Sequence, residues 1–152
     1  MFLSPHFQLG EMASTSHVDL AAANLADAHA YIPALTALCA VILEPVRAQF
    51  GPVSVHVAYR NAALNAAVGG AATSQHLIGE AADFHCPQAP LLDVYKWIIA
   101  SPIPFGQAIQ ERRGPGEWQW IHLSLGEPWR PRSASRQALW SADGVTYHPW
   151  QG

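Results

Sequence analysis

The segment SQHLIGEAAD, residues 74–83, places a histidine and a carboxylate seven positions apart with mostly small residues between them. Further along the chain, the strand-like run WIH at 120–122 supplies a second histidine. Two imidazoles and one carboxylate form a three-ligand set that leaves one tetrahedral position of zinc open for water. The sequence therefore predicts a site for one Zn²⁺ ion held by His76, Asp83 and His122. Mixed nitrogen and oxygen ligands favour zinc, but they also suit cobalt or manganese.

The alternative to a metal site is a chance pairing, because the chain has eight histidines and an isolated histidine is more often a hydrogen-bonded surface or core residue. His76 and Asp83 belong to the pattern S-x-H-x-x-G-x-A-x-D, and His122 belongs to W-x-H. Patterns of this length weigh against chance. The other histidines lack such a context and are interpreted as non-ligands: His6, His17, His29, His56, His85 and His148.

The elements around these residues are predicted from hydrophobic periodicity and from Gly and Pro punctuation. Apolar residues at three- and four-residue spacing predict a long helix over 32–50, kinked at Pro45, and period-two alternation predicts strands. The other expected helices are a short one from residue 21, 62–68 after an Asn61 cap, and 91–100. The expected strands are 53–58, 80–85, 105–111 and 118–125, with a hairpin turn at 112–117 and a closing strand at 144–147 in a surface tail, 126–152. Helices followed by an antiparallel sheet predict an α+β fold.

Composition predicts a single domain spanning residues 1–152. Half of the residues are hydrophobic and only 12% are charged, which suits a compact enzyme and excludes a disordered chain. A net charge of −3 with eight basic residues gives no reason to expect nucleic acid or an anionic membrane surface, and we expect a monomer. We expect neither a signal peptide nor a membrane-spanning run. Cys39 and Cys86 are expected to be reduced and not to bind metal.

The ordered motifs resemble those of the M15 peptidases, which are zinc D-Ala-D-Ala carboxypeptidases and L-Ala-D-Glu endopeptidases that cut bacterial peptidoglycan. Beyond the two motifs above, the similarity includes LSPHF at 3–7, YRN at 59–61 and LNAAVGG at 64–70. It covers roughly the whole chain and is greatest for the short phage-type branch. The resemblance implies a hedgehog/DD-peptidase-like fold, a small antiparallel sheet with helices packed on one side. It also implies a peptidoglycan stem peptide as substrate.

Three further site residues are expected, the first of them from the resemblance. Arg60, in the Tyr-Arg segment, is expected to bind the carbonyl oxygen or terminal carboxylate of the substrate, since its fork makes bidentate hydrogen bonds to carboxylates. A surface salt bridge is the alternative. Ser74 is expected to orient His76 or to bind substrate, with a capping hydroxyl as an equal alternative. Trp120 is expected to wall the cleft with Trp118, Trp129 and Phe105, unless these aromatic side chains belong to the core.

The general base departs from the family pattern. Zinc hydrolysis needs a proton acceptor near the metal-bound water, and many relatives carry an acid three residues before the last histidine ligand. Gln119 occupies that position here and cannot accept a proton. Glu111 is the better candidate, because it alternates with Gln107 and would share the face of that residue. Glu117 is a weaker candidate, and a satisfied edge charge is the alternative role for Glu111.

The leading hypothesis is thus a zinc metallopeptidase with Glu111 and Arg60 as catalytic residues. The two M15 activities are not distinguished, because they share the metal site and differ in the shape of the cleft. The rival hypothesis, motivated by Gln119, is a catalytically degenerate zinc-binding structural or cell-wall-binding module on the same scaffold. From the resemblance we expect a phage or prophage product that is made in the cytoplasm without a signal peptide and acts on the cell wall.

Overall fold

The computed structural model describes residues 1–129 and 135–152; residues 130–134, which belong to the predicted surface tail, lie outside the described part. The α-helices are α1 (Leu9–Met12), α2 (Ala21–Ala28), α3 (Ile32–Leu38), α4 (Glu44–Phe50), α5 (Ala62–Ala67) and α6 (Leu91–Ala100). The strands are β1 (Ser54–Val57), β2 (Ala81–His85), β3 (Phe105–Glu111), β4 (Trp120–Leu125), β5 (Gln137–Ser141) and β6 (His148–Pro149). The fold is α+β, as predicted.

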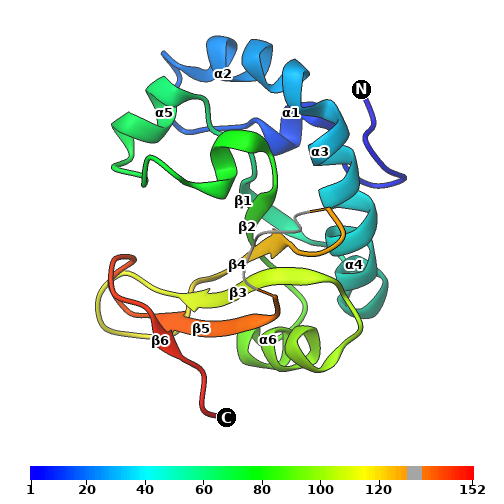
Figure 1. The fold of residues 1–152 in the computed structure, drawn as a ribbon, viewed down its shortest axis with the longest axis vertical. Helices are drawn as coiled ribbons and strands as arrows, with labels where there is room; N and C mark the ends of the chain where they lie inside the picture. The colour runs from blue at the N-terminus through cyan, green and yellow to red at the C-terminus, as the bar shows by residue number, and fades with distance from the viewer. Residues whose placement is uncertain (130–134) are drawn as a thin grey trace.

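One six-stranded sheet organises the molecule, with strand order β1-β2-β4-β3-β5-β6 (Figure 1). The pairs β1–β2, β2–β4, β3–β4 and β5–β6 are antiparallel. The sheet is antiparallel, as predicted, except at one pair, where β5 runs parallel to β3. The central strands β2, β4 and β3 therefore each have a neighbouring strand on both sides, which fixes the positions of the side chains that they carry.

The tail forms two strands, β5 and β6, whereas one strand at 144–147 was predicted. β5 was missed by the sequence analysis, and the closing strand is β6 at 148–149 instead of 144–147. Residues 144–147 form a turn because the Asp143 carboxylate accepts hydrogen bonds from the backbone N–H groups of Val145 (2.8 Å) and Thr146 (2.7 Å). An aspartate that binds the backbone two and three residues ahead favours a turn over a strand.

The core helix runs without interruption from residue 21 to residue 50, through a short 3-10 turn η1 (His29–Tyr31) and a π-helical segment η2 (Cys39–Leu43). The helix was predicted to kink at Pro45, and it instead widens into that π segment just before the proline. There the Glu44 N–H donates to the Cys39 carbonyl five residues back. A wider turn accommodates a proline, whose ring clashes with the carbonyl four residues earlier. Gly51 (φ 79°) ends the helix, as predicted.

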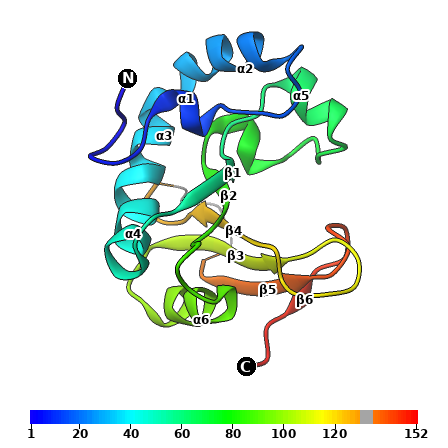
Figure 2. The ribbon, with the colours of Figure 1, turned by 180° about the vertical axis from the view of Figure 1, so that it is seen from behind.

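Helices cover one face of the sheet, and the other face is left for a cleft. Leu38, Ile42, Val94 and Ile98 from the core helix and α6 pack in one buried cluster with the sheet side chains Ala82, Phe84, Ile121 and Leu123. In Figures 1 and 2, α6 lies against the sheet on the side away from α2 and α5. Because side chains alternate along a strand, Asp83 and His122 point to the opposite face from Phe84 and Ile121.

The core helix, Ala21–Phe50, is also long and apolar enough to cross a membrane by length and composition alone, contrary to the expectation of no such segment. Its apolar residues have a structural role here, since Leu35, Leu38, Ile42 and Val46 are fully buried in the core of the domain. A helix that supplies the core is apolar for the same physical reason as a membrane helix.

Candidate active site

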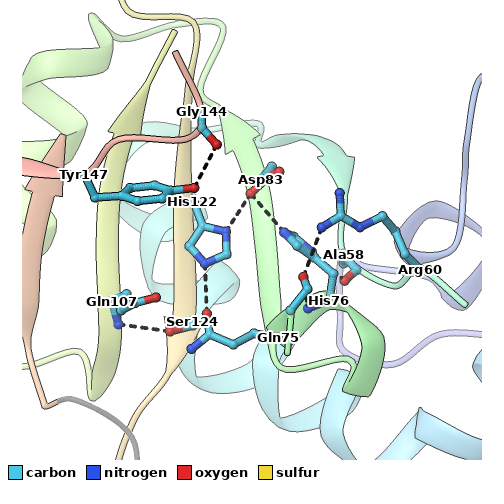
Figure 3. A network of polar contacts seen from close by, with 11 residues as sticks. Ala58, Arg60, Gln75, His76, Asp83, Gln107, His122, Ser124, Gly144 and Tyr147 are labelled. Atoms are coloured by element: carbon cyan, nitrogen blue, oxygen red, sulfur yellow. Dashed lines mark hydrogen bonds and ion pairs between the residues drawn. The ribbon is translucent and has the colours of Figure 1, made fainter. Parts of the chain in front are cut away.

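Three side chains from separate segments converge on the open face of the sheet. Asp83 on β2 and His122 on β4 are directly paired across the two strands. His76 comes from the 3-10 turn η3 (Gln75–Ile78), which precedes β2. One ligand atom from each residue lies within 4.8 Å of the other two, and Figure 3 shows both imidazoles pointing at the Asp83 carboxylate. The structure thus brings together the three residues predicted as zinc ligands.

His76 is held in one orientation by its backbone surroundings. It is 3% exposed, and its Nδ1–H donates a 2.9 Å hydrogen bond to the Ala58 carbonyl oxygen. This bond leaves Nε2 as the nitrogen that faces Asp83 Oδ1, at 3.2 Å. Gly79, at φ 69°, closes the turn after η3 in a left-handed conformation that suits glycine. A histidine that donates its second N–H to a backbone carbonyl is oriented in the way that metal-ligating histidines usually are.

His122 is oriented by Gln75, a residue that the sequence analysis quoted without assigning a role. The Gln75 side-chain oxygen lies 3.0 Å from His122 Nε2, and His122 Nδ1 lies 2.9 Å from Asp83 Oδ1 (Figure 3). The contact of Nε2 with the amide oxygen holds the ring so that Nδ1 faces the Asp83 carboxylate. The only signal for Gln75 in the sequence is its position next to His76.

The chemistry of this donor set fits a zinc ion. Although burial by itself raises the pKa of Asp83, the neighbouring His76 and the hydrogen bond from His122 hold that pKa well below its usual range. The Asp83 carboxylate is therefore charged, and each imidazole nitrogen that faces it would offer a lone pair to a metal ion once it has lost its proton. Zinc bonds of about 2.0–2.2 Å place tetrahedral ligand atoms roughly 3.3 Å apart. The distances from Asp83 Oδ1 to the two imidazole nitrogens, 2.9 and 3.2 Å, are close to that value.

A cleft of about 710 Å³ surrounds the three side chains. One wall is formed by the backbone after α5, around residues 68–71, and by η3. The floor is the open face of the sheet, including Gln107, Ile109 and Trp120. The opposite wall comes from Arg113 and from the tail residues Gly144, Val145 and Tyr147. The three candidate ligands therefore lie at the base of a space large enough for a peptide segment.

Arg60 lies in the cleft at the end of the segment that follows β1. Its Nη2 donates to the Ser74 hydroxyl (3.1 Å), and its Nε is buried without a hydrogen-bond partner in the described part of the chain. Ser74 also accepts a hydrogen bond from the His76 backbone N–H (3.3 Å) and begins η3. The serine therefore acts as a cap and also connects Arg60 to the ligand segment.

Among the acids considered as general base, the structure places Glu111 in the cleft and the others outside it. Glu111 is 8% exposed at the end of β3, paired with Trp120. Burial, and then the charge of Asp83, raise the pKa of Glu111. Gln119 is exposed and accepts a hydrogen bond from the Arg113 backbone N–H (3.1 Å), and Glu117 is also exposed. Neither Gln119 nor Glu117 lines the cleft.

The predicted aromatic wall is reduced to Trp120. Trp118 packs edge-on against Trp140, and Phe105 is buried in the core. Trp129 lines a separate apolar hollow with Trp97. Tyr147 was not considered, although it is the second aromatic residue of the cleft. No motif marks it, because the tail reaches the cleft only through the β3–β5 pairing.

The other histidines lie outside the three-residue group. His56 and His85 face each other across β1 and β2, with 2.6 Å between ring nitrogens. His6 pairs with the Glu44 carboxylate (2.8 Å), and His148 stacks on Trp140. Both cysteines are free and buried.

Comparison with known proteins identifies the family. A family model described as Peptidase M15 matches residues 5–124, and no curated protein matches the chain. The match covers more than half of the chain and includes all three candidate ligands, Arg60 and Glu111. The chain therefore belongs to the peptidase M15 family, which implies a zinc-dependent peptidase that acts on peptidoglycan-like substrates. The tail wall of the cleft lies beyond the matched residues.

Proposed function

We propose that this protein hydrolyses peptide bonds in peptidoglycan stem peptides, with one Zn²⁺ held by His76, Asp83 and His122. The observation that carries the proposal is the convergence of these side chains within 4.8 Å at the base of a cleft, in a chain of the peptidase M15 family. The tail walls that cleft, so we also propose that residues 1–152 act as one domain.

Bound zinc would lower the pKa of a water molecule toward about 7 and polarise the scissile carbonyl. The residues of the chain supply the remaining functions. Glu111 takes the proton from the attacking water and returns it to the leaving amine, a role for which a carboxylate with a raised pKa is suited. Arg60, fixed by Ser74, donates to the oxygen on which negative charge develops. Trp120 provides a flat surface for the substrate beside Glu111.

The replacement of the usual acid by Gln119 is compatible with this mechanism. Gln119 is exposed on the loop side of β4, whereas Glu111 reaches the cleft from the neighbouring strand. We propose that the proton acceptor has been relocated to β3, with the metal ligands unchanged.

Digestion of purified peptidoglycan by the zinc-loaded protein tests the proposal, with a chelated sample as control and mass spectrometry as readout. Loss of terminal alanine from pentapeptide stems would identify a D-Ala-D-Ala carboxypeptidase. Stems cut after the first alanine would identify an L-Ala-D-Glu endopeptidase. If a protein that holds one zinc ion per chain releases no product, the peptidase proposal is wrong and the binding module is the correct reading.

A further inference from the structure

The cleft wall built by the tail is a fixed structure. Asp143 accepts hydrogen bonds from the backbone of Val145 and Thr146 and from the Thr146 hydroxyl (2.9 Å), and Ser141 donates to the same carboxylate (3.2 Å). The turn begins where β5 ends, and Ser141 is paired with Glu111. The wall is therefore held beside the candidate general base by the parallel β3–β5 pairing.

The β3–β4 loop joins the tail to complete this wall. The Arg112 backbone N–H donates to the Ser141 carbonyl (3.1 Å), and the Gly114 N–H donates to the Ala142 carbonyl (3.3 Å). Between them, Arg113 lines the cleft, with its side chain beside Gly144 of the turn. The Arg113 guanidinium is thus set against the tail turn at the edge of the cleft.

Arg113 is a cleft cation whose charge acts on Glu111 and Tyr147 only through space, where it lowers their pKa values. Its side chain makes no hydrogen bond or ion pair with the residues that the structure describes, and it is exposed. By contrast, Arg60 is bonded to Ser74, and Arg112 bonds to the Gly116 carbonyl and lies over the Trp118 ring (4.8 Å). The nearest carboxylate of the turn, Asp143, is already occupied by donors from the turn itself.

Tyr147 supplies the flat surface beside Arg113. Its hydroxyl donates to the Gly144 carbonyl (3.1 Å), which fixes the ring, and 47% of its surface remains exposed. Figure 3 shows the ring next to His122, with Arg60 on the far side of Asp83. The two walls of the cleft therefore each present an arginine, and the candidate metal ligands lie between them.

We propose that Arg113 and Tyr147 form a carboxylate-binding subsite that positions a peptide substrate on the tail side of the metal centre. An exposed guanidinium at a cleft edge makes bidentate, charge-assisted hydrogen bonds to a carboxylate, and a fixed aromatic ring limits where the adjoining peptide can lie. The inference rests on the proposed function in one respect, that the ligand is a peptide. The carboxylate comes either from the C-terminus of the peptide or from an internal acidic residue.

Binding to the zinc-loaded protein tests this subsite, with a synthetic stem pentapeptide in three forms: the free acid, the C-terminal amide, and the peptide with its glutamate replaced by glutamine. Calorimetry gives the dissociation constants, and wherever cleavage occurs, KM and kcat are measured as well. We expect one neutralised form to bind about 10- to 100-fold more weakly than the free acid, as expected for loss of a hydrogen bond between charged groups. The form that loses affinity identifies the source of the carboxylate.

The variant Arg113→Gln is expected to lose this discrimination, to raise KM with little change in kcat, and to bind one zinc ion as the wild type does. Arg113→Lys should restore part of the preference, and Tyr147→Phe, which keeps the ring but removes the hydrogen bond that fixes it, should retain part of it. Arg47→Gln on α4 removes the same charge away from the cleft and should have no effect.

An Arg113→Gln protein that keeps the wild-type preference would overturn the inference, as would a wild type with no preference at all. Failure of the proposed function is distinguishable from both results. In that case no peptide is cleaved, but the calorimetric preference for the carboxylate form still depends on Arg113.

Discussion

At the level of single residues, the two candidate histidine ligands are oriented by partners that are distant in the sequence. His76 is fixed by a carbonyl 18 residues earlier in the chain, and His122 by an amide 47 residues away. Contacts of this kind depend on how the chain folds back, and any glutamine or backbone carbonyl can make them. Gln75 and Ala58 therefore carried no recognisable signal.

Gln75 offers a direct test of that orientation. Replacing it with leucine removes the acceptor for His122 Nε2–H, so the imidazole is free to rotate away from Asp83. We expect zinc affinity to fall about 10- to 100-fold, the usual cost of removing such a partner. Competition with a chelator of known affinity measures the change. Unchanged affinity in Gln75→Leu would show that His122 is positioned without the amide.

The raised pKa of Glu111 predicts the acid limb of the activity profile. A general base must be deprotonated, so kcat/KM is lost as the pH falls through the pKa of Glu111. Burial, the main cause of the shift, raises that pKa above the ordinary value of 4.5 in the metal-free chain, whereas the charge of a bound Zn²⁺ would lower it. The acid limb should therefore follow this carboxylate, and Glu111→Gln should remove it while lowering kcat by about 10²- to 10⁴-fold. An acid limb that survives in Glu111→Gln at full activity would assign it to another group.

At the level of elements, periodicity predicted the main helices and the central strands but not their irregularities. The core helix was expected to kink at Pro45, and the chain instead forms a π segment before it. β5 was missed because its short alternation follows a proline-containing stretch and buries only Leu139 and Ser141. Parallel strands are joined by a long crossover connection, so the residue pattern of β5 does not indicate that it pairs with β3.

Ile42, in the π segment, tests how much the core helix contributes to stability. Its side chain is fully buried in the cluster that joins the helix to the sheet. We expect Ile42→Ala to lower the free energy of unfolding by about 2–5 kcal/mol, the range for deleting a large aliphatic side chain from a core. Urea denaturation gives the value, and the exposed Val18→Ala (86% exposed) should change it by less than about 0.5 kcal/mol. If Ile42→Ala and Val18→Ala changed the free energy of unfolding equally, the burial of Ile42 in the core would be contradicted.

At the level of the whole molecule, the cleft is formed by parts of the chain that differ in how well they could be predicted. The residues matched by the family model supply the ligands, Arg60 and Glu111, and all of these were proposed from the sequence. The tail wall was not proposed, because a proline-rich tail carries no sign that it will pair with β3. The final architecture depends on the long-range β3–β5 contact.

A chain ending at residue 126 tests whether the tail is part of the domain. It keeps every residue matched by the family model but loses β5, which pairs with β3. It also removes the Leu139 carbonyl that accepts from the Tyr95 hydroxyl (2.8 Å), which leaves that hydroxyl only the more distant Ala108 carbonyl (3.2 Å). We expect a lower midpoint in urea denaturation than for the full chain. An equal midpoint would show that the matched segment folds independently of the tail.

The most direct test of the central claim is the rate of peptide release from peptidoglycan as zinc is added stepwise to the metal-free protein. The convergence of His76, Asp83 and His122 predicts that the rate rises until one zinc ion is bound per chain and then stays constant, and that Asp83→Ala neither retains the ion nor releases product. A wild-type protein that binds one zinc ion but releases no peptide would contradict the account, as would release that is unaffected by removing the metal.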